Sequence, residues 1–205
     1  AAVPRVHHVF LVGPRDGLEQ YENDQVRLVP PGGSLFDNVK IGLAHAGTEM
    51  VLLCASDIPL VTPAMIEDLL DKCISSGADF CYPVSEKKDC DTAFPGVQRT
   101  YMTLVEGTYT GGNIFFVRRA VVERAWPLVE KMIAYRKKPL KMASVLGFFL
   151  LLKLILKRAR VHEFENRVHN LLGLVPKAIL GVQPEIGVDV DKPSDLELCR
   201  RVLAK

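Results

Sequence analysis

Two acidic segments of the sequence carry the side chains best suited to hold a divalent metal ion. The first is Ser56-Asp57-Ile58-Pro59, which directly follows a strongly apolar run. In the second, Gly187 to Leu196, Asp189 and Asp191 alternate along a segment that we expect to be extended, so both project to the same side. Magnesium prefers hard oxygen ligands, often one or two carboxylates together with substrate phosphates. We therefore predict Mg²⁺ held by Asp57 together with Asp189 or Asp191.

Each acidic segment also has a purely structural interpretation. Asp57 could merely begin the turn or cap the next helix, with no ligand involved. Asp191 could cap the last helix while Asp189 stays solvated. Asp195 falls inside that helix, where a carboxylate in the first turn is favourable without any catalytic role.

Two glycine-containing segments could approach a ligand closely. Gly32 and Gly33 end a rigid turn before a helix that contains Asn38. The segment Gly111-Gly112-Asn113 leads into a strand, where glycines permit close backbone approach and the asparagine can bond to a sugar or phosphate. The structural alternatives are an ordinary helix-face residue for Asn38 and a simple tight turn for the second pair of glycines.

Arg99 is a candidate for binding the anionic part of a substrate. It lies at the start of a predicted hairpin near the expected ligand crevice. A guanidinium group can hold a phosphate through two parallel hydrogen bonds. A solvated arginine on the hairpin is an equally good interpretation.

The elements that must position these residues follow an α/β pattern. Apolar runs predict strands at 6–12, 26–29, 50–55 and 78–83, and capped helices at 35–46 and 63–76 lie between them. This alternation predicts a three-layer α/β/α fold with a mostly parallel central sheet. Ligands bind at the carboxyl ends of strands in such sheets, and Asp57 follows such an end. The polar segment 85–96 predicts a surface loop.

The second half of the chain adds a hairpin, a strand and several helices. We expect a hairpin at 99–109, a strand at 114–117 and a helix at 121–135, followed by a helical insertion at 136–172. Strands at 177–182 and 186–190 and a helix at 194–203 complete the pattern. No linker interrupts 1–205, so the sequence predicts a single domain.

The insertion contains the longest apolar stretch of the chain, Val145 to Leu152, which continues as Leu154 to Leu156 after Lys153. It is too short to span a bilayer, which takes about 20 residues. Basic residues surround it, including Arg136, Lys137 and Arg158, and could mark contact with a membrane surface. The sequence favours the alternative of a core helix with basic ends, with the aromatic residues at 148 and 149 in the core.

The bulk composition narrows the class of protein. The 205 residues are 48% hydrophobic and carry a formal net charge of +2, too little to indicate a nucleic-acid partner. The five cysteines form no Cys-x-x-Cys pair and are odd in number, which predicts a reduced, cytoplasmic protein without a zinc site. Nothing in the composition indicates an oligomeric state.

The order of these motifs resembles that of one enzyme family. A strand followed by Asp-x-Pro, a Gly-Gly-Asn strand entry, and Asp-x-Asp-x-Pro-x-Asp-Leu before a final helix together resemble the molybdenum-cofactor guanylyltransferase-like (MobA-like) nucleotidyltransferases, from Val6 to Leu203. The resemblance implies a Rossmann-like three-layer fold related to A-type glycosyltransferases. It also implies transfer of a nucleoside monophosphate from a nucleoside triphosphate to a small phosphorylated or hydroxyl acceptor, with release of pyrophosphate.

The resemblance assigns roles to the candidate residues. It implies that Asp57 is the central magnesium ligand and that Asp189 or Asp191 is the second acidic position. The acceptor side would be formed by Gly111-Gly112-Asn113. The nucleotide side would be formed by the residues Gly32, Gly33, Asn38 and Ser56.

The chain departs from the family at the triphosphate loop. The family has a glycine-rich loop after its first strand, with an arginine and a lysine downstream, whereas Gly13-Pro14-Arg15-Asp16-Gly17 is too sparse and follows what resembles the second strand. We expect the first strand, loop and helix upstream of Ala1, and weak triphosphate binding by the chain as given. Two alternatives stay open: an A-type glycosyltransferase using a sugar nucleotide, and a non-catalytic nucleotide-binding relative.

Overall fold

The structure is a computed structural model, and it describes residues 3–135 and 138–204. Its strands are β1 (Val9–Val12), β2 (Val26–Val29), β3 (Met50–Cys54), β4 (Phe80–Glu86), β5 (Met102–Thr103), β6 (Thr108–Gly111), β7 (Ile114–Arg118) and β8 (Pro176–Leu180). Its α-helices are α1 (Leu35–His45), α2 (Pro63–Ser76), α3 (Lys87–Ala93), α4 (Arg119–Tyr135), α5 (Pro139–Leu146), α6 (Phe148–Ile155), α7 (Val161–Leu172) and α8 (Pro193–Leu203). Short 3-10 helices lie at η1 (Glu19–Tyr21) and η2 (Pro184–Gly187). Arg136 and Lys137, at the start of the predicted insertion, lie outside the described residues.

The main sheet is mixed, so the prediction of a mostly parallel sheet was wrong. The strand order is β3-β7-β4-β6-β5, and β8 pairs with the opposite edge of β4. β7 is antiparallel to both β3 and β4, so β3 and β4 run in the same direction without touching. Alternating strands and helices predicted the shared direction of β3 and β4. They could not show that β7, from later in the chain, is inserted between them.

β6 and β7 lie end to end along one edge of β4. β7 pairs with the first part of β4, at Phe80 and Cys81, and β6 pairs with the last part, from Val84 to Glu86. Gly112 lies in the break, where its N–H donates to the carbonyl of Pro83 at 2.9 Å. This break places the Gly-Gly-Asn segment beside the middle of β4, inside the sheet.

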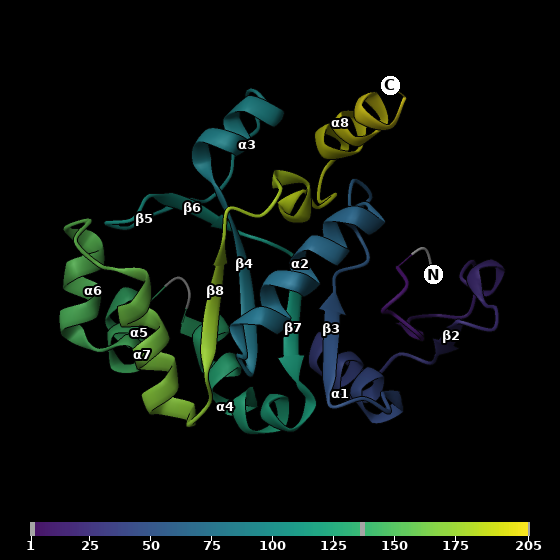
Figure 1. Cartoon of the computed structure of the whole chain (residues 1–205), viewed down its shortest axis with the longest axis horizontal. Coiled ribbons are helices and arrows are strands. Elements are labelled where there is room, and N and C mark those ends of the chain that lie inside the picture. The colour runs from purple at the N-terminus through teal and green to yellow at the C-terminus, as the bar shows by residue number, and fades with distance from the viewer. Residues whose placement is uncertain (1–2, 136–137, 205) are drawn as a thin grey trace.

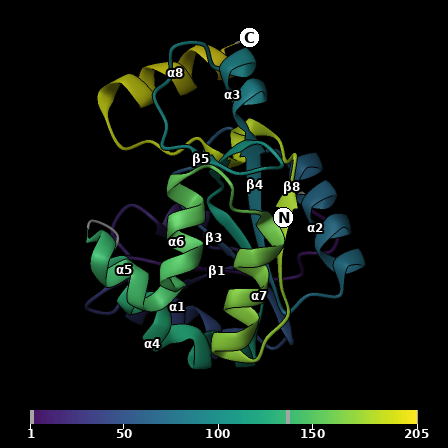
Figure 2. The ribbon, with the colours of Figure 1, turned by 90° about the vertical axis from the view of Figure 1, so that its left-hand side faces the viewer.

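Helices cover both faces of the sheet, as Figures 1 and 2 show. On one face, Leu69 and Cys73 of α2 pack with Phe116 of β7 and other apolar residues. On the other face, a separate cluster joins α1 and α4 to Val117, the next residue of β7. Because neighbouring residues of a strand point to opposite faces, these two clusters are the two interior layers of an α/β/α arrangement.

Helix boundaries follow the capping residues that the sequence indicated. The Ser34 hydroxyl accepts from the N–H of Asp37 at the start of α1, and the Thr62 hydroxyl accepts from that of Met65 at the start of α2. Gly77 and Gly173 end α2 and α7 in the left-handed conformation, at φ of +63° in both cases. These four boundaries are confirmed.

The N-terminal part of the chain forms a separate two-stranded parallel sheet, β1 with β2. The strand predicted from residue 6 begins only at Val9. Before it, the N–H of Val6 donates to the carbonyl of Val3, and the Arg5 guanidinium pairs with Glu67 and Asp71 of α2. Val3 is buried in the α2 core cluster, so this segment docks on α2 instead of extending β1.

Three other local predictions were wrong. The polar segment after β4 contains α3, because Cys90 is buried while Lys87 and Asp91 pair one helical turn apart. The strand predicted at 186–190 is replaced by η2 and an irregular segment. The aromatic side chains predicted in the core, Phe148 and Phe149 of α6, are 66% and 78% exposed.

Among the helices that the structure describes, none has both the length and the apolar character needed to cross a membrane.

Candidate active site

The two acidic segments meet at one end of the sheet. The N–H of Val190 donates to the backbone carbonyl of Asp57 at 3.0 Å. This bond places Asp189 and Asp191, the two neighbours of Val190, beside the turn that follows β3. The sequence predicted the meeting through alternation along a strand, whereas the structure achieves it through this one backbone hydrogen bond.

The carboxylates at this meeting point are available to a ligand. Asp57 and Asp191 are exposed and Asp189 is half-buried. Within the described residues, none of the three carboxylates forms an ion pair or accepts a hydrogen bond. Such oxygens match the preference of Mg²⁺ for hard donors. No cluster of three or more potential protein ligands occurs among the described residues.

Asp195 has a structural role, as its position in the final helix indicated. Its Oδ2 accepts from the N–H groups of Lys192 and Asp191, at 3.0 Å and 3.2 Å. It therefore satisfies backbone donors at the start of α8. The interpretation of Asp191 as the cap of this helix is wrong, because the residue before α8 is Lys192.

The Gly-Gly-Asn segment borders the same region. The carbonyl of Asn113 accepts from the N–H of Ala55, just after β3, and its N–H donates to the carbonyl of Ile186 in η2. Both bonds are 3.0 Å long. Asn113 thus joins the end of β3 to the segment that leads to Asp189. Both its backbone N–H and its carbonyl form hydrogen bonds within the fold, whereas its side chain forms none among the described residues.

Arg99 reaches across to η2 from before β5. One of its terminal nitrogens, Nη1, donates to the carbonyl of Gly187 at 2.7 Å, and the guanidinium lies 5.8 Å from the ring centre of Phe94. Its Nε and Nη2 atoms are buried and have no hydrogen-bond partner in the described residues. Buried N–H donors without partners are costly, and a charged group more so. Arg99 is therefore a positive charge that an anionic ligand would stabilise.

A cleft of about 370 Å³ connects most of these groups. Its walls include Arg99, Gly111, Asn113, Asp189 and Asp191. Asp57 does not line the cleft itself but lies next to it through its bond to Val190. The cleft also exposes Lys192 and Thr100, which the sequence did not single out. Lys192 directly follows the Asp-x-Asp pair, and that adjacency was the available signal.

The Cys54 thiol, at the end of β3, is affected by the charge of the nearby Asp57 carboxylate. The thiol donates to the carbonyl of Ala55 at 3.2 Å. Desolvation by neighbouring protein atoms and, secondly, the charge of Asp57 raise the pKa of the Cys54 thiol to about 11, although part of the residue is exposed. The thiol therefore stays protonated at neutral pH and is a poor nucleophile there.

The structure gives the predicted nucleotide-side residues a local role. The Asn38 side-chain carbonyl accepts from the N–H of Gly32 at 2.8 Å, which closes the turn before α1. A Cβ atom on Gly32 would lie 2.5 Å from the Cβ of Asp37, so this position requires glycine. No hydrogen bond in the described chain joins this turn to Ser56 or Asp57. Gly33 and Ser56 are exposed.

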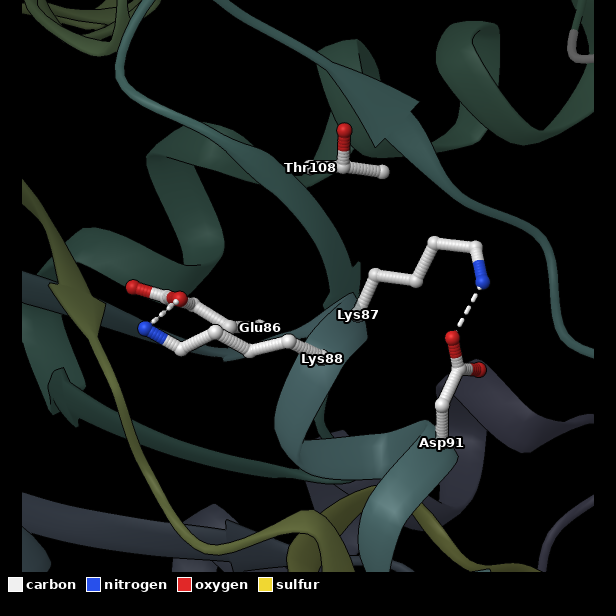
Figure 3. A pocket seen from close by; sticks show the side chains of 5 residues that line it. All are labelled: Glu86, Lys87, Lys88, Asp91 and Thr108. Carbon is white, nitrogen blue, oxygen red and sulfur yellow. Dashed lines mark hydrogen bonds and ion pairs between the residues drawn. The ribbon is translucent and has the colours of Figure 1, made fainter. Parts of the chain in front are cut away.

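A second hollow, of about 300 Å³, lies over the start of α3 (Figure 3). Its charged side chains pair with one another, Glu86 with Lys88 and Lys87 with Asp91. Charges that are already neutralised by neighbours leave little for a ligand to bind. None of the residues predicted from the sequence as site residues lines this hollow.

Comparison with known proteins places this geometry in context. The family model described as "MobA-like NTP transferase domain" matches residues 1–147. A solved structure described as a hypothetical transferase from Thermus thermophilus is 36% identical, with a TM-score of 0.80, over 90% of this chain and 78% of that chain. No curated protein matches the sequence.

Two more distant structures share the fold. The 2-C-methyl-D-erythritol 4-phosphate cytidylyltransferase of Francisella tularensis is 15% identical, with a TM-score of 0.55, over 97% of this chain and 81% of that chain. A CMP:2-keto-3-deoxy-manno-octonic acid synthetase, in complex with CTP, is 13% identical, with a TM-score of 0.60, over 98% and 83%. At these identities the likeness concerns the fold alone. The family model and the Thermus thermophilus structure together show that this chain belongs to the MobA-like NTP transferase family.

Proposed function

We propose that the chain transfers a nucleoside monophosphate from a nucleoside triphosphate to a small acceptor that carries a phosphate or hydroxyl group. The acceptor oxygen, from a phosphate or from a hydroxyl group that gives up its proton to solvent, bonds to the α-phosphorus. The bond from that phosphorus to the oxygen that bridges the α- and β-phosphates breaks, and pyrophosphate leaves. The observation that carries this proposal is the backbone bond between Val190 and Asp57, which brings the turn of Asp57 beside the segment whose Asp189 and Asp191 line the cleft. Membership of the family and the fold shared with two nucleotide-using enzymes support it.

Each group in or beside the cleft would have a role in this reaction. Asp57, with Asp189 or Asp191, would hold Mg²⁺, which supplies neutralisation of phosphate charge when bound. Arg99 would attract the anionic part of the acceptor, because its Nε and Nη2 atoms lack partners. Gly111 and Asn113 form the neighbouring wall of the cleft.

The test combines ligand binding with turnover. Each of the four ribonucleoside triphosphates is added with magnesium, and the thermal midpoint of unfolding is measured for the unmodified chain, Asp57→Asn and Asp16→Asn. We expect one triphosphate to raise the midpoint for the unmodified chain and Asp16→Asn but not for Asp57→Asn. Asp16 is an exposed carboxylate that does not line the cleft, and it serves as the matched control.

Binding should be weak, with a Kd on the order of a millimolar, because the glycine-rich triphosphate loop has no match in this sequence. For the stabilising triphosphate, pyrophosphate release with a panel of sugar and alcohol phosphates should fall by on the order of a hundredfold or more in Asp57→Asn. Unchanged release in that variant would refute the assignment of Asp57.

A second candidate function is a nucleotide-binding relative without catalysis. The observation behind it is that no segment of residues 1–205 matches the glycine-rich triphosphate loop. Stabilisation by a triphosphate without any pyrophosphate release would select this alternative. Release of a nucleoside diphosphate from a sugar nucleotide would instead select a glycosyltransferase.

A further inference from the structure

The helix α6 exposes several large apolar side chains on one face. Phe148, Leu152 and Ile155 recur at helical spacing, and Phe149 and Leu156 lie beside them. Three of these side chains are more than 60% exposed: Phe148 at 66%, Phe149 at 78% and Ile155 at 67%. Figure 2 shows α6 in the outer layer, with α5 and α7 beside it. We call these five side chains the α6 apolar face.

The chain around this face is strongly and uniformly positive. Residues 131–162 contain nine lysines and arginines and no aspartate or glutamate. Because the whole chain carries a formal charge of +2, the remaining residues carry −7. Lys157, Arg158 and Arg160 follow α6 directly and are exposed. Within the described residues, no carboxylate lies within ion-pair distance of these three side chains.

Other contacts hold α6 in this outward position. Lys153, the one charged residue within α6, pairs with Glu163 of α7. The carbonyl of Ala159 accepts from the N–H of Val105 at 2.9 Å, and Glu106 accepts from the N–H of Val161 at 3.2 Å. The turn between β5 and β6 is therefore hydrogen-bonded to the connection between α6 and α7. These bonds and the ion pair of Lys153 hold α6 with its apolar face exposed.

The charge pattern argues against self-association through this face. A symmetric dimer would place the same surface of each copy against the other, so two positive regions would meet. The protruding phenylalanines also need no matching pocket in a fluid apolar medium. A surface that combines apolar side chains at helical spacing with flanking lysines and arginines fits the interface of an anionic bilayer.

We propose that this protein binds reversibly to anionic membrane surfaces, with the α6 apolar face inserted among the lipids and the surrounding basic residues against their headgroups. The site is separate from the proposed catalytic cleft, so binding does not depend on any activity. Phe148 and Phe149 supply the insertion, and Arg158 and Arg160 supply part of the electrostatic attraction.

Vesicle sedimentation tests the proposal. The whole chain is mixed with vesicles of phosphatidylcholine alone, or of equal parts phosphatidylcholine and phosphatidylglycerol, and the bound fraction is measured at low and high salt. We expect binding to the anionic vesicles only, weakened by salt because screening shortens the range of the attraction. The double variant Phe148→Ser/Phe149→Ser should lower the partition coefficient by about tenfold or more.

Matched variants separate the face from general surface effects. Tyr21→Ser/Leu203→Ser removes two exposed apolar side chains elsewhere and should bind like the unmodified chain. Arg158→Glu/Arg160→Glu should weaken anionic binding strongly, whereas Arg200→Glu/Arg201→Glu on α8, with the same change of formal charge, should weaken it far less. Circular dichroism confirms that each variant is folded.

Several results would overturn the proposal. One is an unmodified chain that stays in the supernatant with both vesicles, which would leave a protein partner for this face. Another is equal binding by the phenylalanine double variant. A third is a dimer in light scattering that dissociates on the phenylalanine changes while no vesicle binding occurs.

Discussion

At the scale of single residues, Gly112 is the point on which the geometry of the candidate site depends. A Cβ atom at this position would lie 2.8 Å from Cγ2 of Ile186 and 3.2 Å from Cγ of Pro83. Ile186 belongs to η2, which leads directly to Asp189. A side chain at Gly112 would therefore push η2 away from the break between β6 and β7 and disturb the cleft.

We predict that Gly112→Ala lowers the free energy of unfolding by about 1–3 kcal/mol, the cost of overpacking a core position. Urea denaturation of the variant measures this. Gly47→Ala is the control, because a Cβ atom there would meet nothing within 4 Å. Equal stability of the two variants would show that η2 moves freely and does not fix the position of Asp189.

The position of Asp57 could be predicted from the sequence, whereas the surroundings of Arg99 could not. The apolar run and the Asp-x-Pro turn sufficed to place Asp57 at the end of a strand. Arg99 could be named as a candidate, but nothing in the sequence shows that two of its nitrogen atoms are buried without partners. Its surroundings include Gly187, which is 88 residues away in sequence and approaches Arg99 only in the fold.

At the scale of elements, Asp79 joins three strands at one end of the sheet. Its Oδ1 accepts from Nε of Arg118, at the end of β7, at 2.6 Å. Its Oδ2 accepts from the N–H of Val175, just before β8, at 2.9 Å. Asp79 itself directly precedes β4, so one carboxylate fixes β4 relative to both of its neighbours.

We predict that Asp79→Ala destabilises the fold by about 2 kcal/mol, because hydrogen bonds to charged groups are lost and the Arg118 charge is left without this partner. Thermal or chemical unfolding checks the value. Asp16→Ala, which removes an exposed carboxylate with no ion-pair or hydrogen-bond partner among the described residues, should change stability by less than about 0.5 kcal/mol. A similar small effect at Asp79 would mean that the strand pairing alone aligns β4, β7 and β8.

Element types were predictable from the sequence, whereas their pairing was not. Capping by Ser34 and Thr62 and the left-handed Gly77 are local signals, and they correctly bounded α1 and α2. The insertion of β7 between β3 and β4 is a long-range event without a local signal. The short helix α3 escaped prediction because it buries only Cys90, too little to create a hydrophobic period.

At the scale of the whole molecule, charge is distributed unevenly along the chain. The sequence pI is about 8.3, and the region 131–162 contains nine lysines and arginines without an aspartate or glutamate. We predict that the protein is retained on a cation exchanger at a pH just above its pI. The variant Arg158→Glu/Arg160→Glu should elute earlier than Arg200→Glu/Arg201→Glu. Identical elution of the two variants would mean that net charge alone governs retention.

The position of β3 has a practical consequence for handling the protein. It is the end strand of the main sheet, and within the described residues β7 is the one strand that pairs with it. Its sequence, Met50 to Cys54, is apolar and carries no charge. An uncharged edge strand with free backbone groups is a template for intermolecular strand addition. Concentrated samples should therefore be prone to aggregation through sheet growth, and β3 is the strand to protect when the protein is formulated.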